Sequence, residues 1–165
     1  MRDSTGFDGF ATAQMSALLR PAYYLTGDWD LAHDLVQTTL VKMYGAWGRL
    51  KADVDRVAYA RTVLLNVYRD HCRSERRHRN ALLRKGWAPF EAASVDVPER
   101  DYQRELLLQL PPKQRAVVVL RFLEDLSVQQ TADTLGVSVG TVKSQTADAL
   151  KALRAAIESV GDSHG

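Results

Sequence analysis

The tract that most constrains the fold of this chain is SVQQTADTLGVSVGTVKSQ, in its C-terminal part. Ser127 precedes Gln130 by three residues, which predicts a capping box: the hydroxyl and the amide satisfy backbone donors left free where a helix starts. Ala132 is small where a second helix would pass closely, Gly136 suits the left-handed turn that ends a helix, and Val142 would fill the angle between the helices. These spacings of four and then six residues are typical of a helix-turn-helix.

The second helix of this motif is expected to have one apolar and one polar side. Ser138 can cap its start, and the apolar side contains Val142, Ala149, Leu150 and Leu153. The outward side carries Gly140, Thr141, Lys143, Ser144, Ala147 and Asp148. In a DNA-binding helix-turn-helix, such positions meet base edges and phosphates. A helical hairpin without a DNA partner would need the same cap, small residue and glycine, but the polar, lysine-bearing outer side favours DNA binding.

The rest of the chain also has the period of helices. Apolar residues recur at three- and four-residue steps, and no segment alternates strictly over the length of a strand, so we predict an all-α protein. Helices are expected over residues 10–25, from the TGDWD segment to about residue 47, and from near 55 to about 77. The expected inward residues are Leu31, Leu35, Met43 and Trp47 in the second helix, and Val57, Leu64, Leu65 and Tyr68 in the third.

A break in the helical period divides the chain. Between residues 80 and 98 the sequence mixes glycine, proline and small residues, which indicates a linker. Helical patterning resumes with ERDYQRELLLQL, stops at two consecutive prolines and continues as KQRAVVVLRFLEDL. We therefore expect two small helical domains, residues 1–79 and 99–160, joined by a flexible linker at 80–98.

Positive charge is concentrated in one helix. The whole chain carries a formal net charge of only +2, but residues 61–79 contain six arginines against two acids, Asp70 and Glu75. Charge runs are usually solvated surfaces. Here, however, Tyr59, Asn66 and Tyr68 interleave stacking and hydrogen-bonding groups with the arginines, a pattern typical of single-strand binding.

Several classes of protein are disfavoured by composition. Cys72 is the only cysteine, so the chain has no internal disulfide and no thiolate cluster for zinc. The N-terminal segment lacks the apolar run of a signal peptide, and the longest apolar run, AVVVL, is too short to cross a bilayer, so we expect a cytoplasmic protein. An enzyme built on His33–Asp34 or His71–Cys72 is disfavoured because adjacent residues point to different sides of a helix. The chain has no glycine-rich phosphate loop and its four histidines lack ligand spacing, so we expect no catalysis, metal or cofactor.

Three segments, in order, resemble one family. DLAHDLVQTTLVKMY resembles the helix of sigma region 2 that docks on RNA polymerase, AYARTVLLNVYRDHCRSERR resembles the segment that melts and reads the −10 element, and LPPKQRAVVVLRFLEDLSVQQTADTLGVSVGTVKSQ resembles region 4, which reads the −35 element. By this resemblance the chain is identified as a member of the extracytoplasmic-function (group 4) sigma factors of the sigma-70 family, close to the short actinobacterial SigE-like group.

The resemblance implies a function, partners and site residues. The chain would bind core RNA polymerase through the clamp helices of the largest subunit, and through the flap, and would direct initiation at promoter DNA under the control of an anti-sigma factor. The implied clamp-binding residues are Asp34, Gln37, Thr38 and Val41. The implied −10 residues are Tyr59, Arg61, Asn66, Arg69 and Arg73. The implied −35 residues are Thr141, Lys143, Ser144, Ala147 and Asp148.

This sequence departs from many relatives at two positions of region 4. Gln145 and Asp148 stand where arginine is common, and an acid loses attraction for phosphate although it can accept a hydrogen bond from a cytosine amino group. We expect Asp148 to shape −35 preference and not to supply affinity. The alternative function is a stand-alone helix-turn-helix regulator that does not act as a polymerase subunit, but it leaves the first half of the chain without a role.

Overall fold

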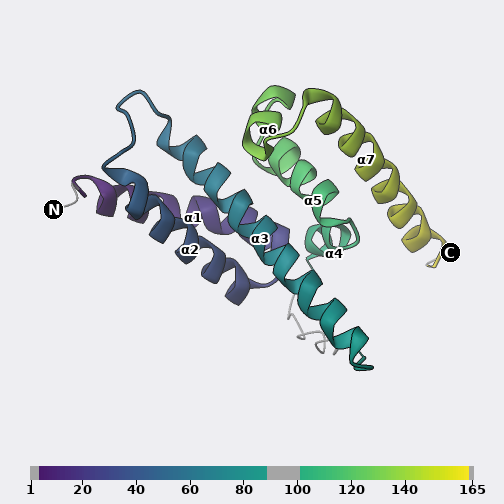
Figure 1. The fold of residues 1–165 in the computed structure, drawn as a ribbon. Coiled ribbons are helices and arrows are strands. Elements are labelled where there is room, and N and C mark those ends of the chain that lie inside the picture. The colour runs from purple at the N-terminus through teal and green to yellow at the C-terminus, as the bar shows by residue number, and fades with distance from the viewer. Residues whose placement is uncertain (1–3, 89–100, 164–165) are drawn as a thin grey trace.

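The computed structural model describes residues 4–88 and 101–163, and no strand occurs among them. The elements, in chain order, are α1 (Phe7–Thr26), α2 (Trp29–Trp47), α3 (Arg56–Arg84), α4 (Tyr102–Leu108), α5 (Pro112–Val118), a π-helical turn η1 (Val119–Leu123), α6 (Val128–Leu135) and α7 (Val139–Asp162). Helices α1 to α3 form one group and α4 to α7 a second, with α3 lying between α2 and the second group (Figure 1). The prediction of an all-α protein is confirmed.

The first group is a three-helix bundle whose helix starts are encoded locally. The Asp28 side chain accepts hydrogen bonds from two backbone amides of the first turn of α2, and Asp55 accepts one at the start of α3. Such caps stabilise a helix by about 1 kcal/mol each. Trp47 closes one end of the bundle, where its ring meets Phe7 and Phe10 and its indole N–H donates to the Thr5 carbonyl over 3.0 Å.

Apolar side chains of this bundle turn inward as the sequence predicts, with two exceptions. The buried residues include Leu35, Met43, Trp47, Leu64, Leu65 and Tyr68. Leu31 is only half-buried, and Val57 is 41% exposed, so the expectation that Val57 faces the core is wrong. Val57 lies in the first turn of α3, where it borders a small surface cavity between α3 and α1.

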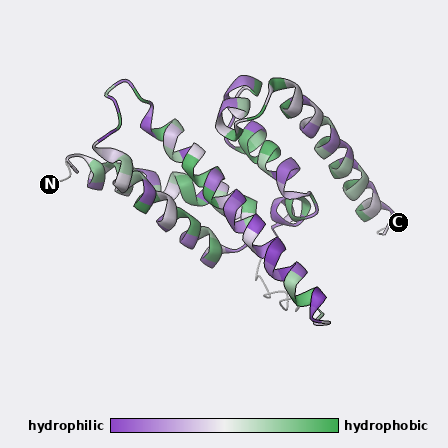
Figure 2. Cartoon of the chain, in the orientation of Figure 1, coloured by the Kyte–Doolittle hydropathy of each residue, from purple (hydrophilic) through white to green (hydrophobic). Residues whose placement is uncertain are grey.

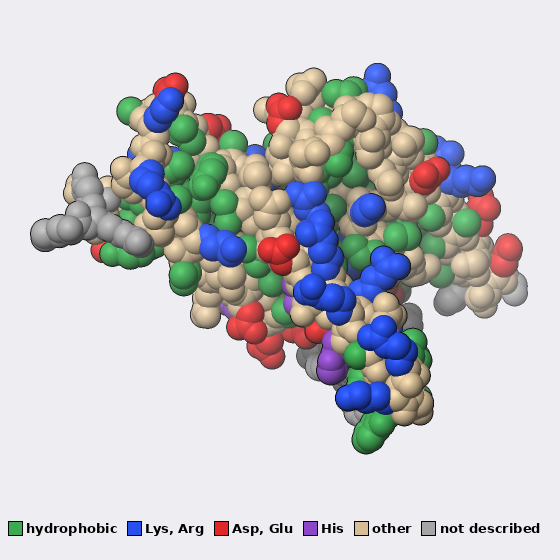
Figure 3. Space-filling view, in the orientation of Figure 1, with side chains coloured by type: hydrophobic (Ala, Val, Ile, Leu, Met, Phe, Trp, Pro, Cys, Tyr) green, Lys and Arg blue, Asp and Glu red, His purple; other side chains and the backbone are tan. Residues whose placement is uncertain are grey.

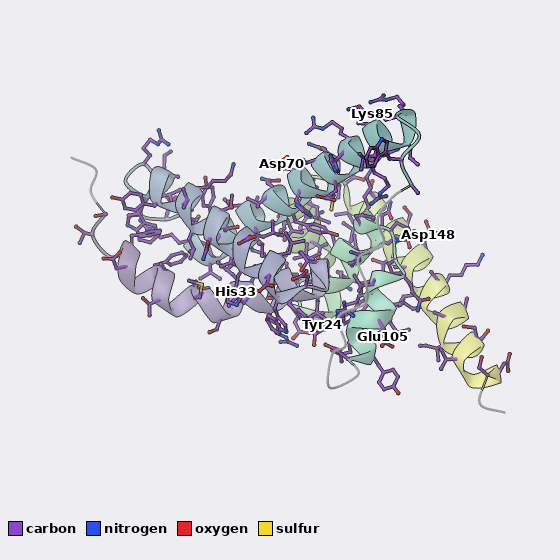
Figure 4. All side chains as sticks on the ribbon, turned by 90° about the horizontal axis from the view of Figure 1, so that it is seen from below. Tyr24, His33, Asp70, Lys85, Glu105 and Asp148 are labelled. Carbon is purple, nitrogen blue, oxygen red and sulfur yellow. The ribbon has the colours of Figure 1, made fainter. Side chains whose placement is uncertain are left out.

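The third helix is longer than expected. It continues seven residues beyond Arg77, to Arg84, so the first part of the expected linker is helical. Its last buried residue is Tyr68, and the stretch from Asp70 to Lys85 extends away from the bundle (Figure 4). The hydropathy colouring is mostly hydrophilic along this stretch, with hydrophobic residues near its end (Figure 2). The remainder of the expected linker, residues 89–98, lies outside the described residues.

The second group places the helix-turn-helix on a short scaffold. Pro112 occupies the first position of α5, where a missing N–H costs nothing, and α5 packs against α7. The helical run then widens locally into η1, a π turn that the sequence period does not predict. Asp125 follows with a φ of 53°, which reverses the chain toward α6.

Candidate nucleic-acid and polymerase interfaces

The helix-turn-helix has the geometry that its sequence predicts. Ser127 Oγ accepts from the backbone N–H of Gln130 over 3.0 Å, and the Gln130 side chain accepts from the Ser127 N–H over 2.9 Å. Gly136 adopts a left-handed conformation, with φ 65°, and its N–H donates to the Ala132 carbonyl. Ala132 and Val142 are both buried between the two helices. The two helices are therefore fixed relative to each other by local contacts.

The outer side of α7 is not covered by any other element in the described part of the chain. Ser138 caps the helix by accepting from the Thr141 N–H over 3.0 Å. The predicted −35 residues Thr141, Lys143, Ser144, Ala147 and Asp148 are all exposed. Among the described residues, neither Lys143 nor Asp148 forms an ion pair, so both charges face solvent. Figure 4 marks Asp148 on this helix.

The predicted clamp-binding residues share one exposed face of α2. Asp34, Gln37, Thr38 and Val41 are exposed, and the Thr38 hydroxyl donates to the Asp34 carbonyl over 3.0 Å. Val41 is 71% exposed, and Tyr44, one turn further along, is 44% exposed. Tyr44 was not singled out in the sequence, although its position three residues after Val41 places it on the same side of the helix. The face thus combines polar groups with two exposed apolar side chains.

The predicted −10 residues lie along α3, but they differ in solvent exposure. Asn66 and Arg73 are exposed, whereas Tyr59, Arg61 and Arg69 are half-buried. Arg73 lies 3.7 Å from Asp70 in an exposed ion pair. Lys and Arg side chains gather along this helix and its far end in the space-filling view (Figure 3).

Arg69 connects the two helical groups. One of its guanidinium nitrogens donates to Asn66 Oδ1 over 2.6 Å, and the other donates to the Leu135 carbonyl, at the end of α6, over 2.8 Å. Arg61 of α3 also lines a small cavity together with Glu124, the residue that directly follows η1. Burial raises the pKa of the Glu124 carboxyl, while Arg61 and Arg20 lower it. The −10 surface predicted on α3 is therefore in contact with the second helical group.

The contacts between the two helical groups form a junction, to which Arg115 also contributes. Sequence reasoning missed Arg115. Its guanidinium donates to the carbonyls of Leu107 and Leu108 at the end of α4, of Leu110 in the turn that follows, and of Leu25 in α1. It also lies 3.5 Å from the Tyr68 hydroxyl, whose pKa is raised by burial. The sequence feature that could have pointed to Arg115 is its position as a single arginine directly before the apolar run AVVVL.

Residues 4–88 and 101–163 contain neither a cluster of metal ligands nor a membrane-spanning helix. No group of three or more His, Cys, Asp or Glu side chains is placed to hold a metal ion. No helix in this part of the chain is long and apolar enough to cross a membrane.

Comparison with known proteins finds relatives that match most of the chain. Residues 11–78 match the family model of sigma-70 region 2, and residues 101–153 match that of sigma-70 region 4. The RNA polymerase sigma-E factor of Streptomyces coelicolor is 36% identical over 148 residues, which cover 90% of this chain and 84% of that protein. The ECF RNA polymerase sigma factor SigL of Mycobacterium tuberculosis is 32% identical over 154 residues, with 88% and 85% covered.

Solved structures have a similar fold. The sigma factor RpoE of Bartonella quintana, in complex with the anti-sigma factor NepR, superposes with a TM-score of 0.73 at 23% identity, covering 92% of this chain and 96% of that one. CnrH, in complex with the cytosolic domain of CnrY, superposes with a TM-score of 0.64 at 25% identity, covering 93% and 88%.

Proposed function

This chain belongs to the extracytoplasmic-function sigma factors of the sigma-70 family, and from that premise we propose how its surfaces divide the work of promoter recognition. Its function is that of an alternative sigma factor, which binds core RNA polymerase and directs promoter-specific initiation. It is not itself an enzyme. The alternative function, a stand-alone regulator, is not favoured. The relatives match both halves of the chain, and the first half matches the family model of sigma-70 region 2.

The proposed contact with the polymerase clamp is the exposed face of α2 formed by Asp34, Gln37, Thr38 and Val41. An exposed valine among polar groups suits a protein interface, where apolar contact supplies affinity and the polar groups fix orientation. Tyr44 extends this face by one turn and belongs to the same proposed contact.

The proposed −10 surface is α3, with Tyr59, Arg61, Asn66, Arg69 and Arg73. A base that leaves the duplex loses stacking and pairing worth a few kcal/mol, and binding of the extruded base offsets this cost. Aromatic and amide groups can hold the base, while arginines hold the adjacent phosphates. Because the offset depends on which base is held, strand opening becomes selective for sequence.

The proposed −35 surface is the outer side of α7, with Thr141, Lys143, Ser144, Ala147 and Asp148. The N-terminal end of the helix can hold a phosphate through its backbone amides, and Lys143 adds a positive charge beside it. Asp148 can accept from a cytosine amino group and repels phosphate, so we assign it to sequence preference.

The remaining assignments are proposed on the family relationship. The domains are residues 1–79, region 2, and residues 99–160, region 4, with a linker at 80–98. The site of action is the cytoplasm, where RNA polymerase works. An anti-sigma factor is a proposed partner, since RpoE of Bartonella quintana was solved with one.

The clamp assignment is tested by Asp34→Arg. The substitution reverses a charge in the middle of the proposed contact without disturbing the buried side of α2, so the variant should fail to co-purify with core polymerase. Asp8→Arg, an equal charge change at an exposed position of α1, is the control and should co-purify as the wild type does. Normal core binding by Asp34→Arg would show that the polymerase uses another face.

A further inference from the structure

The polar end of α3 continues well beyond the proposed −10 surface. Residues 70–85, here called the α3 arm, extend away from the three-helix bundle (Figure 4). Every residue from 73 to 80 is exposed, and so are residues 83–85. The helix nevertheless ends in an ordered way: Gly86 has a φ of 80°, and the Trp87 N–H donates to the Leu82 carbonyl over 3.0 Å. The α3 arm is therefore a defined helix whose side chains mostly face solvent.

The α3 arm is strongly basic. It contains five arginines and Lys85, against the two acids Asp70 and Glu75. Among the described residues, only Arg73 of these six cations forms an ion pair, with Asp70 over 3.7 Å, and that pair is exposed. Lys and Arg side chains accordingly gather at this end of α3 in the space-filling view (Figure 3). The arm thus presents positive charge that an anionic partner can reach.

Three of these arginines lie in line with the proposed −10 surface. Arg73, Arg77 and Arg84 follow Asn66 by 7, 11 and 18 residues. At 3.6 residues per turn these separations are close to two, three and five whole turns, so the three arginines share the side of α3 that carries Asn66. We call them the arginine row. Other charged residues of the arm lie on different sides of the helix: Glu75, Arg79 and Lys85.

The arginine row is long enough to follow several base pairs of DNA. Between Asn66 and Arg84 an α-helix rises by about 27 Å. Duplex DNA rises by about 3.4 Å per base pair, so this distance corresponds to about eight base pairs. Asn66 is proposed to meet the separated strand of the −10 element. The row therefore extends from the point of strand separation over the DNA beside it.

The arrangement of the proposed surfaces indicates which DNA this is. All buried residues of α3 lie between Ala60 and Tyr68, so the opposite end of the helix is held in the bundle and the arm is the end that leads toward region 4. Region 4 carries the proposed −35 surface, which reads a duplex. DNA that runs from the −35 surface to the −10 surface therefore passes the arm while it is still double-stranded.

We propose that the arginine row of the α3 arm binds phosphates of the duplex directly upstream of the −10 element, independently of its base sequence. This inference rests on the proposed −10 and −35 assignments. Contacts with phosphates fix the position of a duplex and carry no sequence information. The row thus orients the end of the duplex so that the strand leaving it reaches Asn66. Because each contact releases counterions, this part of the affinity falls as salt is added.

Two double variants of the full-length protein, each assembled with core polymerase, test the proposal. Arg77→Gln with Arg84→Gln removes two charges from the arginine row. Arg79→Gln with Lys85→Gln removes two charges from other sides of the same arm and is the matched control. All four residues are exposed, and glutamine keeps a high helix propensity. None of the four belongs to the proposed clamp, −10 or −35 residues.

The measurement compares two promoter fragments that carry the −10 element found by aligning start sites and that lack the −35 element. One ends at the upstream edge of the −10 element, and the other carries about ten more base pairs of duplex, slightly more than the row can span. Binding of both fragments to each holoenzyme is titrated between about 50 and 200 mM salt. The longer fragment is made with three unrelated upstream sequences.

The wild type and the control should bind the longer fragment severalfold more tightly than the shorter one, whatever the upstream sequence. The arginine-row variant should lose this gain, and the slope of log affinity against log salt on the longer fragment should become shallower by about 1.8, or about 0.9 for each lost phosphate contact. On the shorter fragment all three proteins should bind equally.

Several results would overturn the proposal. An equal loss in both double variants would show that the arm attracts DNA only by its total charge. A gain that depends on the upstream sequence would indicate base reading, and loss of core binding by the arginine-row variant would show that the arm contacts polymerase. Wild-type holoenzyme that starts at no defined site would refute the proposed function and this inference with it, whereas normal initiation with an unaltered salt slope in the arginine-row variant would overturn this inference alone.

Discussion

Replacement of Arg115 by alanine should destabilise the protein more than any surface change nearby. The guanidinium makes three hydrogen bonds of 2.8 Å, to the carbonyls of Leu25, Leu107 and Leu110, and two longer contacts of 3.3 and 3.5 Å. Hydrogen bonds to charged groups contribute about 1.5–3 kcal/mol each. Because Arg115 is partly reached by water, we take the low end of this range for the three short bonds and disregard the longer contacts, which gives about 4.5 kcal/mol.

This loss can be measured by urea denaturation followed by circular dichroism. With a slope of about 2 kcal/mol per molar urea, the unfolding midpoint of Arg115→Ala should fall by about 2 M. Arg115→Lys should recover only part of the loss, since an ammonium cannot span carbonyls on both sides of the junction. The control is Lys113→Ala, an exposed basic residue in the same helix, which should stay within about 0.5 kcal/mol of the wild type. If Arg115→Ala costs less than about 1 kcal/mol, the hydrogen bonds do not hold the junction as argued.

Two further predictions concern DNA. Asn66→Ala should leave core binding intact and lower the yield of open complexes on permanganate footprinting, because the amide lies on the proposed strand-reading surface; an unchanged yield would remove Asn66 from that surface. Asp148→Arg should bind promoter DNA more tightly, with a salt dependence steeper by about one phosphate contact, and can change the preferred −35 sequence. If neither the slope nor the preference changes in binding titrations, Asp148 is only a solvated acid on α7.

Helix starts and the helix-turn-helix could be predicted because their determinants are local. Asp28, Asp55, Ser127 and Ser138 each cap a helix with a side chain that lies within three residues of the amides it binds. Gly136 takes the positive φ that its position demands. Each of these features depends on a few consecutive residues, so the sequence contains all the information that is needed.

The junction could not be predicted because its contacts join distant segments. Arg69 meets a carbonyl 66 residues away, and Arg115 meets one 90 residues away. Periodicity shows which side of α3 is apolar, but the polar side that carries Arg61, Asn66 and Arg69 has no signal that distinguishes contact with region 4 from contact with solvent or DNA. Every residue has a backbone carbonyl, so the sequence does not indicate which of them accepts a hydrogen bond from a distant arginine.

The length of α3 could not be predicted from the sequence either, for a different reason. Its last turns carry arginines and no buried stripe, so the apolar period ends well before the helix does. Arginine, alanine and leucine all favour helix, and this propensity continues the helix to Arg84 without tertiary packing. The apolar period alone therefore predicts that the linker begins before α3 ends. Helix propensity explains why these residues are helical in the structure.

Run-off transcription with purified core polymerase tests the central claim most directly. Core polymerase supplied with this protein should initiate at a discrete set of sites on genomic fragments, and alignment of those sites should show a −35 and a −10 element at constant spacing. Asp34→Arg should abolish these transcripts, and Asp8→Arg should preserve them. Core polymerase that starts at no defined site with the wild-type protein, although the protein binds duplex DNA by itself, would contradict the claim that this chain acts as a sigma factor.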